Sequence, residues 1–144
     1  MINTFLLVWN PKRWQWKDLG VLKARLNNGG VITRDWSCGN TKKISVGDRV
    51  FIIRLGLEPK GIFASGVVEK ERHLGPHWDP EEKRQIYYVT ISFDKLLNPE
   101  SEKVLYREEL ENKDFQPMHW DSQMSGIQIP ADVAKQLETV WEKL

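Results

Sequence analysis

Only one of the 144 residues is a cysteine, Cys38. A single cysteine excludes an internal disulfide and a four-cysteine zinc site, and it suits a reducing compartment. Long apolar runs are also absent: no stretch reaches the length of about 18 residues that a transmembrane helix needs, and the N-terminus lacks the basic and apolar regions of a signal peptide. We therefore expect a cytoplasmic domain that does not bind a membrane.

Motifs of the common catalytic and metal centres are missing too. The chain has no Walker-type loop, no His-Asn-His nuclease motif and no paired catalytic carboxylates. His73 and His77 have the spacing of metal ligands, but no cysteine lies near them and Asp79 alone does not complete a site. Cys38 has no evident base beside it that would make it a nucleophile. We expect no catalytic residue, no metal and no cofactor.

Acidic residues are scarce in the first half of the chain, and basic residues in the second. Residues 1–72 hold 13 Lys and Arg against 6 Asp and Glu, whereas residues 73–144 hold 8 against 14. The net charge of +1 therefore separates into +7 and −6. A basic half in a balanced chain favours one basic face toward a polyanion, although charges scattered over a solvated surface would give the same totals.

The length is that of one domain, and we expect a single domain over residues 1–144. Apolar runs, helical stripes and turn residues predict an α+β fold around a curved or closed sheet. The strands over residues 50–53 and 61–68 should pair as a hairpin, with bulges or close backbone contacts at Gly61 and Gly66. The other expected elements are strands over residues 4–8 and 85–93, a strand or extended segment over 31–36, helices over 16–27 and after 130, a short helix over 105–111 and a polar loop over 72–84.

One segment has the composition of a binding pocket. Trp36-Ser37-Cys38-Gly39-Asn40 places an indole next to small polar groups, and it has too few apolar residues for a buried strand. An aromatic face beside hydrogen-bonding groups is what a pocket for a flat polar ligand needs. We therefore take Trp36, Ser37, Cys38 and Asn40 as candidate pocket residues, with Cys38 as a small thiol in the pocket wall.

The chain has seven tryptophans, and the others divide by their surroundings. Trp16 and Trp141 fall on apolar stripes of helical spacing, which predicts core positions. Trp9 and Trp14 are expected to pack and not to bind a ligand, and Trp120 receives no role. Trp78 lies in Gly-Pro-His-Trp-Asp-Pro, which is either a rigid loop with an anchoring indole or part of a binding site.

Three segments, in this order, resemble one family. They are Phe5-Leu6-Leu7-Val8-Trp9-Asn10; Trp36-Ser37 with the later 47–50 turn and 61–66 strand; and Gly75-Pro76-His77-Trp78. Over nearly the whole chain they are similar to the EVE domains of the PUA-like superfamily, relatives of the YTH domains that read methylated adenine in RNA. The segment 125–130 is similar to that of EVE modules in modification-dependent restriction endonucleases. The resemblance implies an α+β fold with a curved β-barrel flanked by helices.

The resemblance also implies roles for single residues. By position in the YTH motifs, Trp36 and Trp78 correspond to two walls of an aromatic cage, and Asn10 to the residue that bonds the base edge. Ser37 would contact the base or the backbone. The third wall has no match, and Val8 stands where YTH domains carry a phosphate-binding lysine. Phosphate contact is therefore expected from nearby cations and a backbone clamp, namely Lys12, Arg13, Lys42, Lys43 and the Ser125-Gly126 turn.

The expected function is a non-catalytic reader of double-stranded DNA. It would flip 5-methylcytosine or 5-hydroxymethylcytosine into the cage and target a nuclease in the same or another chain. Extruding a base costs about a few kcal/mol, and stacking on an aromatic wall returns roughly 1–3 kcal/mol. Two alternatives stay open: a reader of N6-methyladenine in DNA or of a modified base in RNA, and, from another class, a nucleoside-like small-molecule sensor or small enzyme.

Overall fold

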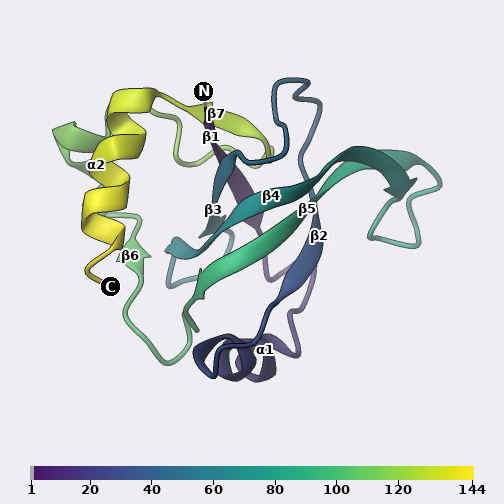
Figure 1. The fold of residues 1–144 in the computed structure, drawn as a ribbon, viewed down its shortest axis with the longest axis horizontal. Coiled ribbons are helices and arrows are strands. Elements are labelled where there is room, and N and C mark those ends of the chain that lie inside the picture. Colours follow the sequence, from purple (N-terminus) through teal and green to yellow (C-terminus); the bar gives the residue numbers. More distant parts are fainter. Residues whose placement is uncertain (1) are drawn as a thin grey trace.

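Strand β1 (Thr4–Trp9) lies inside a mixed sheet in the computed structural model, which describes residues 2–144 (Figure 1). Two short 3-10 turns, η1 (Glu109–Glu111) and η2 (Lys113–Phe115), precede the last strand. The α+β class predicted from the sequence is confirmed. The other elements are α1 (Leu19–Asn27), β2 (Thr33–Ser37), β3 (Arg49–Arg54), β4 (Gly61–Pro76), β5 (Gln85–Leu96), β6 (Leu105–Tyr106), β7 (Ile127–Ile129) and α2 (Ala131–Trp141).

The sheet is curled and open. Its strand order is β2-β5-β4-β3-β1-β7, with β6 paired to β4, and β1 runs parallel to β3. Within residues 2–144 no ladder joins β2 to β1 or β7. The indole of Trp36 on β2 instead donates a hydrogen bond to the carbonyl oxygen of Val8 on β1 (Nε1–O 3.2 Å). A side chain, and not backbone pairing, therefore spans the opening of the curl.

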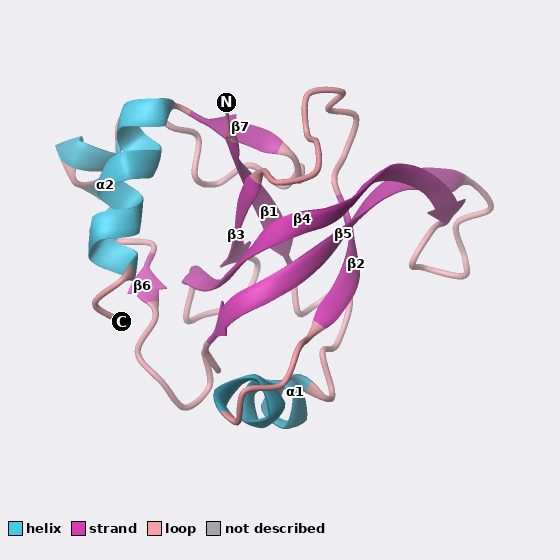
Figure 2. Cartoon of the chain, in the orientation of Figure 1, coloured by secondary structure: helices cyan, strands magenta, loops and turns pink. Residues whose placement is uncertain are grey.

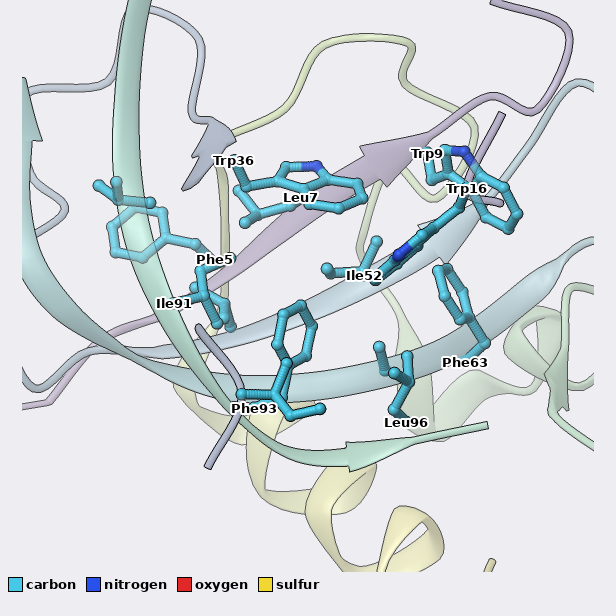
Figure 3. Packing of buried hydrophobic residues seen from close by; sticks show 14 of the residues in the cluster. Phe5, Leu7, Trp9, Trp16, Trp36, Ile52, Phe63, Ile91, Phe93 and Leu96 are labelled. Atoms are coloured by element: carbon cyan, nitrogen blue, oxygen red, sulfur yellow. The ribbon is translucent and has the colours of Figure 1, made fainter. Parts of the chain in front are cut away.

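Both faces of β1 are buried, which explains its uninterrupted apolar sequence. Because successive side chains of a strand point to opposite faces, Phe5, Leu7 and Trp9 enter one core cluster and Leu6 enters the other. The first cluster collects side chains from β1 to β5 (Figure 3). The second lies between the sheet and α2. As Figure 2 shows, α1 and α2 lie at separate ends of the sheet.

Helix α2 has the apolar stripe that the sequence predicts. It begins directly after Pro130, and Val133, Leu137 and Trp141 are buried on the sheet side. Proline suits this place because the first turn of a helix has no partner for its N–H group. Among residues 2–144, neither helix combines the length and the apolar character needed to cross a membrane.

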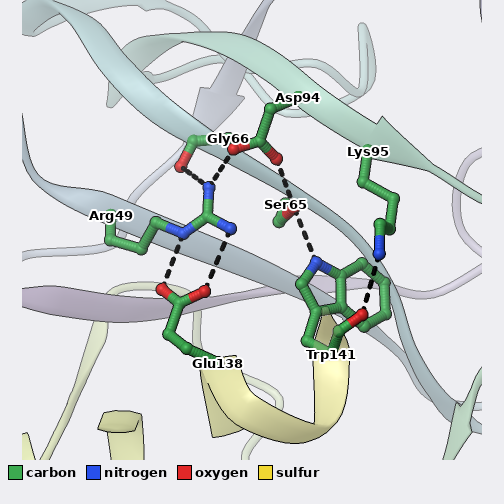
Figure 4. A network of polar contacts seen from close by, with 7 residues as sticks. All are labelled: Arg49, Ser65, Gly66, Asp94, Lys95, Glu138 and Trp141. Carbon is green, nitrogen blue, oxygen red and sulfur yellow. Dashed lines mark hydrogen bonds and ion pairs between the residues drawn. The ribbon is translucent and has the colours of Figure 1, made fainter. Parts of the chain in front are cut away.

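A polar network fastens α2 to the sheet (Figure 4). Arg49 of β3 donates two hydrogen bonds to the carboxylate of Glu138 on α2 (2.8 and 3.2 Å) and also pairs with Asp94 of β5. The Trp141 indole donates to Ser65 Oγ (2.8 Å). Burial disfavours the charged guanidinium of Arg49, but the two carboxylates outweigh this and raise its pKa above the usual range.

The predicted hairpin of β3 and β4 is confirmed, as are its close backbone contacts. A Cβ atom at Gly61 would lie 2.4 Å from the carbonyl oxygen of Leu105, and one at Gly66 would lie 2.5 Å from that of Ser92. Glycine is needed at both positions because neighbouring strands approach the backbone there.

Three predicted boundaries are wrong. Helix α1 begins at Leu19 and not at residue 16, because Trp16 precedes the helix and packs into the first core cluster. The loop predicted over 72–84 is shorter, since β4 runs to Pro76 and pairs with β5 in a ribbon that extends beyond β2 (Figure 1). Backbone hydrogen bonds hold this ribbon together, and few of its side chains are buried. Its sequence is therefore polar and resembles that of a loop. Residues 105–111 hold β6 and η1, because Leu105 pairs with β4.

Candidate functional site

A cavity of about 500 Å³ opens at the C-terminal end of β1. Its walls come from four parts of the chain: the end of β1 with the turn after it, β2 with residues 39–40, the tip of the β4–β5 ribbon, and residues 123–125. The volume falls within the range of roughly 300–1,000 Å³ typical of small-molecule pockets. Segments far apart in the sequence therefore meet around one space.

Asn10 lines this cavity and also builds the turn after β1. Its carbonyl oxygen accepts hydrogen bonds from the N–H groups of Arg13 (3.0 Å) and Trp14 (3.2 Å), and its side-chain Oδ1 accepts from Lys12 N–H (3.0 Å). A backbone N–H can only donate, so the atom that faces it must be the amide oxygen. Among residues 2–144 the Asn10 Nδ2 group has no acceptor, so it is free to donate to a ligand.

Gly56 holds the Asn10 amide in place. A Cβ atom on Gly56 would lie 2.3 Å from Asn10 Oδ1 and 2.6 Å from its Nδ2, so the amide rests against the glycine backbone. Gly56 also has φ +83°, a left-handed conformation that favours glycine. This contact is a part of the site that the sequence analysis missed.

Trp36 forms the floor of the cavity. Only 7 % of the residue is exposed, and its ring packs against Trp14 (centroids 5.5 Å apart, planes at 89°) and Trp16 (5.3 Å). Trp36 and Ser37 lie on β2, in which Trp36 alone is buried, so the segment is not a buried strand, as its low apolar content predicts.

Trp78 lies at the tip of the β4–β5 ribbon and also lines the cavity. It is half-buried, with the ring of His77 4.7 Å away and the guanidinium carbon of Arg13 5.6 Å from its centroid. A guanidinium over an indole is a favourable cation–π contact. The two tryptophans assigned to cage walls thus face the same cavity.

Trp14 lines the cavity as well, although the sequence analysis expected it to pack. Its carbonyl oxygen accepts a hydrogen bond from the indole of Trp9 (2.9 Å), and 37 % of the residue is exposed. The signal for it was present in the sequence, since Trp14 follows the polar turn Asn10-Pro11-Lys12-Arg13. Trp9, Trp16 and Trp141 are buried, as predicted, although Trp9 also lines the cavity.

Ser37, Asn40 and Ser125 line the cavity, whereas Cys38 does not. Ser125 Oγ accepts a hydrogen bond from Val8 N–H (2.9 Å), which continues the β1–β7 edge beyond its ladder. The Cys38 side chain is fully buried in the first core cluster. Burial raises the pKa of its thiol, and the charge of Arg72 opposes this. Cys38 therefore contributes to core packing and not to the cavity wall.

The positive charges around the cavity differ from those expected. Arg13 lines it together with Arg84, which the sequence analysis missed, while the expected lysines lie outside the lining on exposed segments, namely Lys12, Lys42 and Lys43. Arg84 Nε lies 3.9 Å from Glu82 and is largely exposed. One carboxylate, that of Asp35, also lines the cavity and accepts a hydrogen bond from Thr90 (2.6 Å).

The two histidines with metal-ligand spacing turn to different partners. His73 Nδ1 lies 2.9 Å from the carbonyl oxygen of Glu71, and His77 Nδ1 accepts from Asp79 N–H (3.0 Å). In the described part of the chain, no group of three or more His, Cys, Asp or Glu is placed to hold a metal ion.

Comparison with solved structures identifies the fold. A hypothetical protein from Leishmania major matches with a TM-score of 0.68 and 17 % identity over 99 % of this chain and 96 % of its own. Human THYN1, in complex with DNA containing 5-methylcytosine, matches with a TM-score of 0.68 and 15 % identity over 99 % of each chain. The Mmi1 YTH domain matches at 0.57 and 14 %, over 98 % of this chain and 75 % of its own.

No protein-family model matches the sequence, and no curated protein does either. At these identities the likeness shows the fold alone. The chain shares the α+β fold of THYN1 and of the Mmi1 YTH domain, as the resemblance in its motifs implied.

Proposed function

We propose that this chain is a reader of modified bases in nucleic acid, which takes an extruded base into the cavity at the end of β1. The observation that carries the proposal is the composition of that cavity: four indoles, the Asn10 amide with its Nδ2 donor, and two arginines, around about 500 Å³. Human THYN1, which shares the fold, was solved with DNA containing 5-methylcytosine, and this supports the same ligand class here.

The energetics of the cavity suit an extruded base. Removing a base from a duplex costs about a few kcal/mol, and stacking on an aromatic side chain returns roughly 1–3 kcal/mol. Trp36 and Trp78 are the cage residues of the proposal, and both line the cavity. Stacking on an exposed indole face, together with contact to the buried Trp36, offsets much of the extrusion and favours the added methyl or hydroxymethyl group.

Asn10 would read the edge of the base. Because its oxygen is already bonded to Lys12 N–H, the group that it presents to a ligand is the Nδ2 donor. A donor recognises a ring nitrogen or carbonyl oxygen that carries no proton. Ser37, Asn40 and the carboxylate of Asp35 line the same space and add further polar contacts.

Cations near the cavity would hold the flanking phosphates. Arg13 lines the cavity itself, and Lys42 and Lys43 lie two and three residues after Asn40, which also lines it. Such contacts attract any nucleic acid and lose strength as salt rises. The residues proposed for phosphate contact are Lys12, Arg13, Lys42, Lys43, Arg84 and Ser125.

Double-stranded DNA with 5-methylcytosine or 5-hydroxymethylcytosine is the ligand that we propose first. A chain that binds a modified base without cleaving the DNA needs a partner that carries out the cleavage. We therefore propose that this chain is the targeting module of a modification-dependent restriction system. The nuclease would lie in another domain or subunit.

The substitution Asn10→Asp tests the reader directly. It keeps the oxygen that accepts from Lys12 N–H and replaces the amide donor by a second acceptor, so we expect an unchanged melting temperature. Affinity for the preferred modified duplex should fall roughly tenfold or more, because a buried acceptor of the base loses its partner. Fluorescence anisotropy with duplexes that carry cytosine, 5-methylcytosine, 5-hydroxymethylcytosine, adenine or N6-methyladenine, and with a matching RNA, measures this.

Asn112→Asp is the matched control. Asn112 forms the same kind of turn, with Oδ1 accepting from Asp114 N–H (3.0 Å), and it lies outside the cavity lining. It adds the same negative charge, so any loss that it shares with Asn10→Asp is electrostatic. Equal binding of all probes by the unaltered chain would refute the reader. Preference for N6-methyladenine or RNA would change the ligand, and salt-insensitive binding of a free nucleoside would indicate a small-molecule sensor.

A further inference from the structure

Trp14 is the most exposed tryptophan among residues 2–144. It is 37 % exposed, whereas Trp9, Trp16 and Trp36 are each 7 % exposed. The exposed part of Trp14 belongs to the cavity wall. A single exposed apolar side chain is common on protein surfaces, so exposure alone does not assign a role to this indole.

The structure holds Trp14 more firmly than a chance surface residue. Its N–H donates to the carbonyl oxygen of Asn10 (3.2 Å), and its own carbonyl oxygen accepts from the Trp9 indole (2.9 Å). Its ring also lies 5.7 Å from that of Trp16 and 5.5 Å from that of Trp36. The indole is therefore positioned before any ligand arrives, which lowers the entropy cost of binding.

The angle between the Trp14 and Trp36 rings decides how a bound base can contact each of them. The rings of Trp14 and Trp36 are perpendicular, at 89°. A flat ring that stacks on Trp14 therefore stands at right angles to Trp36 and meets it with an edge. Trp36 exposes only 7 % of its surface, which is too little to cover the face of a base but enough to contact a small substituent.

We propose that Trp14 supplies the stacking face for the extruded base, and that Trp36 closes the end of the pocket against the edge that carries the modification. The proposal rests on the proposed function and deepens it. Trp14 then contributes affinity for any base that enters the cavity, because stacking depends little on base identity. Trp36 contributes the distinction between a modified and an unmodified base.

Trp14→Ala tests this assignment with little change to the turn, because both hydrogen bonds that fix residue 14 use its main chain. Three labelled duplexes serve as probes: 5-methylcytosine or cytosine opposite an abasic site, so that no pair must be opened, and the same duplex without the tested base. We expect Trp14→Ala to weaken binding of both base-containing probes by ~5- to 150-fold. The base-free probe should bind unchanged.

Two further variants separate stacking from structure. Trp14→Phe keeps an aromatic face and should recover most of the lost affinity. Val21→Ala removes part of another exposed apolar side chain, 63 % exposed on α1 and outside the cavity lining, and should change nothing. The quenching of tryptophan emission on binding should also shrink in Trp14→Phe, because the stacked indole is the one removed.

The outcomes distinguish this proposal from the proposed function. No loss with Trp14→Ala, or an equal loss on the base-free probe, overturns the stacking role. A loss confined to 5-methylcytosine overturns it too, because Trp14 would then sense the modification. If the unaltered chain binds both bases equally while Trp14→Ala still costs affinity when a base is present, reading of the modification fails and the stacking role stands.

Discussion

Two glycines join the loop after β2 to the loop before β7. A Cβ atom on Gly126 would lie 2.0 Å from the carbonyl oxygen of Cys38, and one on Gly39 would lie 2.4 Å from that of Ser125. Both residues have positive φ values, +88° and +66°. The contact brings Ser125 next to Asn40, so two residues of the cavity wall depend on backbones that only glycine allows to meet.

Gly126→Ala should destabilise the protein more than an ordinary glycine substitution. Gly29→Ala is the matched control, because Gly29 has nearly the same φ of +86° but has no atom within 4 Å of the added carbon. The control isolates the backbone strain of about 1–2 kcal/mol, and Gly126→Ala adds the clash with Cys38. Urea unfolding of both variants measures the difference, and equal destabilisation would show that the two loops can separate freely.

At the scale of single elements, β1 connects the core to the site. Its neighbour β3 pairs with it from Thr4 to Trp9, whereas β7 pairs with it only from Thr4 to Leu6. At Val8, the backbone N–H donates to Ser125 Oγ, and the carbonyl oxygen accepts from the Trp36 indole. An edge of a strand left without a neighbour is thus covered by two side chains that also form the cavity.

Helix α2 depends on Arg49, and this gives a prediction for stability. The Arg49 side chain is 17 % exposed and lies between Glu138 and Asp94, so Arg49→Ala leaves two carboxylates without their partner. We expect a loss of about 1–3 kcal/mol in the free energy of unfolding. Chemical denaturation measures it, and a double-mutant cycle with Glu138→Gln gives the coupling between the two residues.

An exposed ion pair provides the comparison. Lys60 and Glu58 lie 3.9 Å apart with side chains 39 % and 71 % exposed, so Lys60→Ala should cost less than about 1 kcal/mol. A similar cost for Lys60→Ala and Arg49→Ala would mean that the network of Figure 4 adds nothing beyond surface charge pairing.

At the scale of the whole molecule, net charge and site charge differ. The chain carries only +1 overall, yet Arg13 and Arg84 line the cavity, and lysines lie on the adjacent segments. Nucleic-acid binding responds to the charges that touch phosphates and not to the total.

Salt dependence therefore tests the placement of these charges. Arg84→Ala should reduce the slope of log affinity against log salt by about 1, with the preference for a modified base unchanged. Lys135→Ala on the exposed side of α2 removes the same charge outside the cavity lining and should leave the slope as it is. Anisotropy titrations at several salt concentrations measure both, and an equal effect of the two variants would argue against a local phosphate path.

The sequence by itself determined the α+β class, the buried strands and the last helix, because apolar periodicity reports burial directly. Phe5 to Trp9 and Val50 to Ile53 are apolar on both faces, and no solvated element has that pattern. The order of the tryptophan motifs also carried the resemblance to EVE domains. The ribbon at residues 69–76 was missed because its hydrogen bonds are backbone contacts that leave no trace in side-chain pattern.

Only the tertiary structure decided which side chains share the cavity. Trp14 and Trp16 are two residues apart, yet one is exposed in the cavity wall and the other is buried. Cys38 lies between two cavity residues and points into the core, whereas Arg84 and Gly56 join the site from distant segments. Such placement follows from long-range packing of the curled sheet, and no local pattern of residues encodes it.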